Sequence, residues 1–135
     1  MRVMVDTNVI ISAMVFKSSK MNDVLLHITK HHELCIAAYT IEEVKRVLEE
    51  KFSNVAEDIT RFFTDYPFTP ISPAADSGAP LALIRDEADY PVLYAAIISQ
   101  IDVFVTGDND FFEVKVDRPE MIHPKDYLSR YAQGI

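Results

Sequence analysis

Two aspartates follow short apolar runs that lie far apart in the chain. Asp6 comes directly after the run at 3–5, and Asp108 comes three residues after the run at 103–105. Short β-branched runs of this kind predict strands buried on both faces of a parallel sheet. Open α/β sheets bind ligands beyond the carboxyl ends of such strands. The pattern therefore predicts that both carboxylates reach one edge of the sheet and form a site there.

A third acidic position is Glu43, near the start of a helix predicted from Thr40 to about Phe52. The apolar residues of this helix recur at helical spacing and define one buried face. At about 100° per residue, Glu42 points away from that face, whereas Glu43 lies at its edge. Glu43 is therefore the carboxylate that could reach the sheet, and Glu42 is expected in solvent.

A fourth candidate is Asp89, at the start of a helix predicted to run to about Gln100 with Pro91 in its first turn. Asp86 and Glu87 crowd beside it. Of the three, Asp89 is the best placed, because it lies at the start of the helix itself.

Each of these residues also has a purely structural interpretation. Asp6 could serve only in the turn after its strand, where residues 7 and 8 can cap a helix starting near Val9. Residues 40–43 match a capping box. Asp89 could be an N-cap, and Asp108 could cap a short turn around residue 111.

The chemistry of such a site follows from its ligands. Carboxylates gathered at one edge repel each other and raise each other's pKa values unless something neutralises them. Hard oxygen ligands with no thiolate or imidazole nearby favour Mg²⁺ or Mn²⁺. The single cysteine, Cys35, excludes a cysteine-based zinc cluster and an intramolecular disulfide; we expect it to be a buried hydrophobe. His27 and His31, four residues apart on a predicted helix, are interpreted as a solvated face.

Length and charge limit the class of protein. The chain has 135 residues, of which 49% are hydrophobic, and a formal net charge of −8. We expect one domain spanning 1–135, with no signal peptide, no membrane span and a cytoplasmic location. The acidic balance argues against a broad basic face for nucleic acid. It permits a local basic rim, or an acidic pocket filled by divalent cations.

Predicted strands and helices alternate along the chain, which indicates a single-domain α/β/α sandwich with a mainly parallel sheet. The segment rich in proline from Tyr66 to Pro80 is interpreted as an extended connection that could hold a short extended piece. The strands are predicted at 3–5, 34–37, 103–105 and near 121–123, with a short piece at 68–71; the helices are predicted at 9–16, 21–31, 40–52, 55–66, 89–100 and 124–131.

Four motifs in this order resemble the PIN-domain family, in particular the toxin components of toxin–antitoxin pairs (VapC-like ribonucleases). The similarity extends from Val3 to about Tyr127. It rests on the segments 5–10, 41–48, 85–89 and 105–111, which read VDTNVI, IEEVKRVL, RDEAD and VTGDNDF. Each motif is short, but the four together in this spacing are fairly specific.

The resemblance implies a PIN-like fold and a divalent-metal-dependent ribonuclease. Asp6, Asp89 and Asp108 would hold one or two Mg²⁺ or Mn²⁺ ions that activate water for in-line attack on RNA, and Glu43 would orient that water or hold a second ion. The other residues with implied roles are Asn8 and Thr106 as hydrogen-bonding supports of the first carboxylate, Asp110 as an auxiliary acid, and Lys17, Lys20, Lys45, Arg46 and Arg85 as weak RNA contacts.

The partners implied by the resemblance are an RNA substrate, an antitoxin protein and a second copy of the chain. The alternative is a catalytically silent PIN-like module that binds RNA or protein. A phosphohydrolase acting on DNA or nucleotides is a third possibility.

Overall fold

The computed structural model describes residues 1–72 and 90–132, and the fold is built around one parallel sheet. The described strands lie in the order β3-β2-β1-β4-β5, and every neighbouring pair is parallel. β1 is central, and the strand order reverses beside it, between β1 and β4. Such a reversal is where open α/β sheets form a ligand crevice. The strand bounds are β1 Arg2–Val5, β2 Glu33–Ala37, β3 Thr69–Ile71, β4 Val103–Val105 and β5 Glu120–Ile122.

Side chains that alternate along each strand enter two separate cores. In β1, Val3 and Val5 pack into one core, whereas Met4 packs into the other. In β4, residues 103 and 105 again share the first core, and Phe104 enters the second. A strand with both faces covered reads as a continuous apolar run, which is the reason that these segments were recognisable in the sequence.

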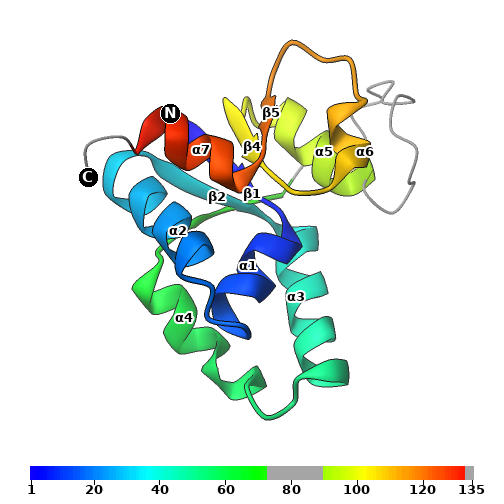
Figure 1. Ribbon diagram of the computed structural model, residues 1–135. Helices are drawn as coiled ribbons and strands as arrows, with labels where there is room; N and C mark the ends of the chain where they lie inside the picture. Colours follow the sequence, from blue (N-terminus) through cyan, green and yellow to red (C-terminus); the bar gives the residue numbers. More distant parts are fainter. Residues whose placement is uncertain (73–89, 133–135) are drawn as a thin grey trace.

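Helices cover both faces of the sheet (Figure 1). The first core lies under α1, α2, α3, α4 and α7, and the second lies under α5 and α6. The predicted three-layer α/β/α architecture is therefore confirmed. The helix bounds are α1 Thr7–Met14, α2 Ser19–His31, α3 Ala38–Lys51, α4 Ile59–Asp65, α5 Tyr90–Ile98, α6 Asn109–Phe112 and α7 Pro124–Tyr131, with a 3₁₀ turn at Ala56–Asp58 before α4.

Two predicted helix starts are wrong. α1 begins at Thr7 rather than near Val9, so residues 7 and 8 do not cap it; Asp6 is the residue before the helix. α3 begins at Ala38, directly after β2, so Thr40 lies inside the helix and the predicted capping box does not form. The Thr40 hydroxyl is buried without a hydrogen-bond partner in the described part of the chain. In both cases the strand passes straight into the helix, leaving no loop for a cap.

Other boundaries differ by smaller amounts. The helix predicted at 55–66 is a 3₁₀ turn followed by the shorter α4. The extended piece predicted at 68–71 is β3, which lies at the edge of the sheet formed by the described strands; Pro70 is tolerated at such an edge. Cys35 is fully buried, as predicted. Within the described residues, no helix has the length and apolarity needed to cross a membrane.

Candidate active site

The centre of the candidate site is the Asp6 carboxylate at the end of β1. β1 and β4 pair in register, with Val5 opposite Val105. The next residue on each side is polar: the backbone N–H of Asp6 donates to the Val105 carbonyl at 3.1 Å, and the Thr106 hydroxyl donates to Asp6 Oδ2 at 2.6 Å. Parallel pairing of the two central strands therefore brings a carboxylate and a hydroxyl together from positions 100 residues apart.

Burial raises the pKa of Asp6 above its ordinary value, because a charged carboxylate is poorly solvated there. Hydrogen bonds from the Thr106 hydroxyl and from the backbone N–H groups of Asn8 and Thr7 act in the opposite direction. The negative charge of Asp108 raises the pKa further. Asp6 is thus a buried acid that faces a like charge, and a nearby cation would favour its ionised form.

Asp108 reaches the same edge through the turn after β4. Its backbone N–H donates to the Thr106 hydroxyl oxygen at 3.0 Å. Its own Oδ1 accepts from the Asp110 backbone N–H at 2.9 Å and caps α6. Asp108 therefore caps the short helix, as its structural interpretation predicted, and its charge also acts on Asp6. One hydroxyl, that of Thr106, links the two aspartates.

Glu43 is oriented towards α1 by Thr7, whose hydroxyl donates to Glu43 Oε1. Its other oxygen, Oε2, lies 3.7 Å from the Arg46 guanidinium one turn later in α3. Glu43 is partly buried and Glu42 is exposed, as the helical geometry predicted. The contact with Thr7 brings Glu43 to the residue that follows Asp6. Sequence reasoning missed this function of Thr7; its place next to Asp6 was the one available signal.

The described carboxylates do not form a metal centre by themselves. Within residues 1–72 and 90–132, no group of three or more His, Cys, Asp or Glu side chains is arranged to hold a metal ion. Asp89, Arg85, Asp86 and Glu87 lie outside the described residues. The three-aspartate metal set therefore stays a prediction.

The residues that are described nevertheless fit a hard divalent cation. The Asp6 and Asp108 side chains supply carboxylate oxygens, and the raised pKa of Asp6 reflects both its burial and the neighbouring negative charge. A divalent cation would offset that charge and is the usual partner of such oxygen ligands.

The remaining predicted residues are placed as follows. The Asn8 side chain is exposed, and it is its backbone N–H that interacts with the Asp6 carboxylate. Asp110 contacts Asp108 through its backbone. Lys17, Lys20, Lys45 and Arg46 are exposed, and the Arg46 guanidinium also lies 3.7 Å from Glu43.

Comparison with known proteins agrees with this fold. The PIN domain family model matches residues 2–110, and the chain therefore belongs to the PIN domain family. Among solved structures, the chain is similar to one in the crystal structure of VapBC2 from Rickettsia felis bound to a DNA fragment from their promoter. The TM-score is 0.74 at 16% sequence identity, and the alignment covers 91% of this chain and 98% of the other. That likeness shows the shared fold. A search of curated proteins found no match.

Proposed function

We propose that this PIN domain protein is a Mg²⁺- or Mn²⁺-dependent endoribonuclease and the toxin of a toxin–antitoxin pair. The observation that carries the proposal is the arrangement of Asp6, Thr106 and Asp108 at the switch point of a PIN-type sheet. It brings a buried acid, its hydrogen-bond donor and a second acid to the edge where such sheets bind ligands.

Asp6 and Asp108 would hold the divalent ion, together with Asp89 by resemblance to the family. When bound, the ion lowers the pKa of a water molecule and polarises a phosphoryl oxygen. The residues of the chain have complementary tasks. Thr106 orients Asp6 by donating to Oδ2, and Thr7 holds Glu43, which would orient the attacking water. In-line attack would produce a 5′-phosphate and a 3′-hydroxyl without using the RNA 2′-hydroxyl.

The proposed partners follow from the relatives. One similar solved structure is that of VapBC2, which supports a protein antitoxin for this chain. An RNA substrate, a homodimer and a cytoplasmic location are proposed by analogy with the family.

The decisive assay uses purified protein and single-stranded RNA, with EDTA, Mg²⁺ or Mn²⁺. We expect cleavage only with metal, and none from Asp6→Asn. RNA binding without cleavage under every condition would instead identify a silent binding module. A parallel incubation with single-stranded DNA tests the choice of RNA as the substrate.

A further inference from the structure

The aromatic ring of Phe112 lies face to face with the imidazole of His123 beside the acidic site. The ring centroids are 4.3 Å apart and the planes differ by 14°. We infer that this pair is a stacking platform for a base of single-stranded RNA. The inference rests on the proposed ribonuclease function and names a contact through which the substrate is held.

Both members of the pair are positioned by the elements that build the site. Phe112 is the last residue of α6, the helix that Asp108 caps. It follows Asp108 by one helical turn, about 6 Å of axial rise. His123 follows β5, whose Ile122 carbonyl accepts from the backbone N–H of Thr106 at 3.0 Å. The stack therefore adjoins the sheet edge that carries Asp6 and its hydroxyl donor.

The pair is accessible to a ligand. Phe112 is 37% exposed, one of the few large hydrophobic residues in the described part of the chain that solvent reaches to this extent. His123 lies against one face of its ring, and the exposed part of the Phe112 side chain is the surface proposed to receive a base. Its neighbour Phe111 is by contrast 1% exposed and packs edge-on against Phe104 in the core. Two consecutive phenylalanines thus have different environments, and only the second is available for binding.

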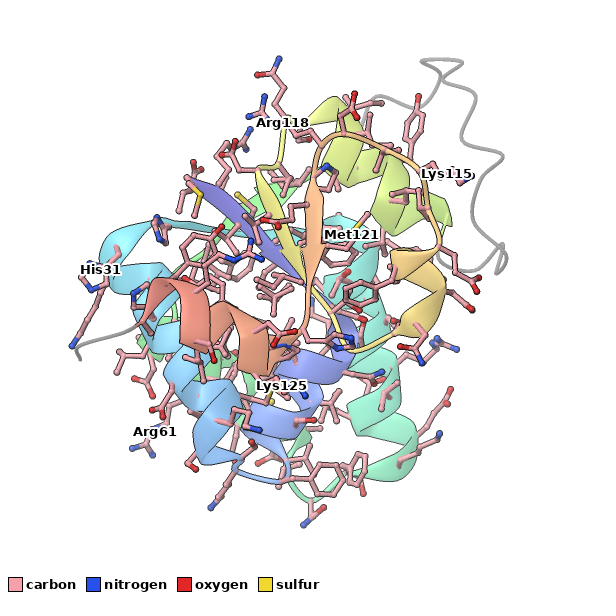
Figure 2. The ribbon with its side chains drawn as sticks, turned by 45° about the horizontal axis from the view of Figure 1, so that its top comes forward. His31, Arg61, Lys115, Arg118, Met121 and Lys125 are labelled. Carbon is pink, nitrogen blue, oxygen red and sulfur yellow. The ribbon has the colours of Figure 1, made fainter. Side chains whose placement is uncertain are left out.

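Charge considerations favour stacking as a source of RNA affinity. A protein with net charge −8 gains little from long-range attraction to phosphates. Stacking of a base on an aromatic ring does not depend on net charge and tolerates any base. A local positive charge is still close in sequence: Lys125, labelled in Figure 2 at the start of α7, is exposed and lies two residues after His123.

The test measures RNA binding in the absence of cleavage. In an Asp6→Asn background, a short single-stranded RNA carrying 2-aminopurine is titrated with protein, and both anisotropy and 2-aminopurine fluorescence are recorded. Stacking on the platform quenches that fluorescence. Phe112→Ala should weaken binding about 5- to 140-fold, the range for loss of one stacked base, and should abolish the quenching.

Matched variants separate stacking from folding. Phe112→Leu keeps an apolar side chain but removes the ring, and should behave like Phe112→Ala; Phe112→Trp should bind and quench like the parent. Phe16 is a second exposed phenylalanine in ring contact, with Phe52 at 5.7 Å, and it lies on the α1–α2 connection. Phe16→Ala should leave affinity and quenching unchanged.

The outcomes distinguish this inference from the proposed function, which is measured by metal-dependent cleavage with the wild-type protein. If the wild type cleaves RNA but Phe112→Leu binds and quenches like the parent, the platform is wrong and the function stands. If the wild type does not cleave but quenching depends on Phe112, the platform stands and the function is wrong. Absence of RNA binding by the Asp6→Asn protein would overturn the platform.

Discussion

The Thr106 hydroxyl donates to the Asp6 carboxylate at 2.6 Å, across the two central strands of the sheet. The same oxygen accepts from the backbone N–H of Asp108 at 3.0 Å. Thr106 is fully buried. A single side chain therefore orients one acid and positions the turn that carries the other.

Replacing Thr106 with valine should impair catalysis while keeping the shape of the side chain. Loss of the donor removes an interaction that lowers the pKa of Asp6, so the acidic limb of the pH–rate profile should move to higher pH. Loss of such a support of a metal-binding side chain typically costs 10- to 100-fold in metal affinity or activity, and we expect about that here. Thr106→Ser should retain most activity. Unchanged kinetics in Thr106→Val would show that the contact is only structural.

Asp6→Asn should raise the stability of the metal-free protein at neutral pH. The pKa of Asp6 in the folded state lies above its unfolded value of 3.8, so ionisation disfavours folding. The penalty is absent well below pH 3.8 and develops as pH rises through the folded pKa. In EDTA, the variant should melt above the wild type at pH 7, and the difference should shrink towards pH 4. A variant less stable than the wild type at pH 7 would contradict the cost assigned to the buried charge.

Added Mn²⁺ should reverse the order of the two melting temperatures, so that the wild type melts above Asp6→Asn. An ion that binds only the folded state stabilises it by about 2.7 kcal/mol at a hundredfold excess over Kd. The melting temperature of the wild type should therefore rise with Mn²⁺, and that of Asp6→Asn should change little. Equal shifts for both proteins would place the ion elsewhere.

Thr7→Val should lower kcat about tenfold with little change in KM, because the hydroxyl that holds Glu43 is lost. Within the described part of the chain, Glu43 would then keep its contact with Arg46. Thr7→Ser, which keeps the donor, is the control, and circular dichroism verifies that α1 still forms. A Thr7→Val enzyme with normal kcat would remove Glu43 from the mechanism, or show that it needs no positioning.

Stability at acidic pH should depend on a histidine cluster remote from the site. His27 is buried, its Nδ1 lies 2.7 Å from the Tyr127 hydroxyl, and its ring contacts those of His31 and His32. The prediction of a solvated face is therefore wrong for His27, because α7 covers it. Figure 2 shows His31 on the side of the view opposite α6.

Burial, and then the charge of His31, lower the pKa of His27 below 6.5. Its neutral form is favoured on folding, so stability is lost as pH falls from 6.5 through the folded pKa. Between pH 7 and pH 5, the melting temperature of the wild type should decrease by a few degrees more than that of His27→Gln, which keeps an acceptor for Tyr127. The pKa of His32 is also lowered by burial. The melting temperature of His27→Gln should therefore still decrease as pH falls, but less steeply. If the melting temperatures of the wild type and His27→Gln decrease equally between pH 7 and pH 5, His27 is not a source of the pH dependence.

The order of strands and helices was readable from the chain because it depends on local patterns. Runs such as 3–5 and 103–105 are apolar at every position, which strands buried on both faces require. Helical periodicity alone predicted that Glu43 lies at the edge of the buried face of α3. The resemblance to PIN domains, carried by short motifs, was confirmed by the family model.

Contacts between distant residues were decided only by the tertiary structure. The family resemblance implied that Thr106 supports the first carboxylate, but only the pairing of β1 with β4 shows that its hydroxyl also accepts from the backbone N–H of Asp108 and so links the two aspartates. Nothing in the sequence indicated that the Thr7 hydroxyl would donate to Glu43, or that Phe112 would stack on His123 beside the site. A local pattern reports which face of an element is apolar, whereas the partner of a polar group depends on which elements are packed together.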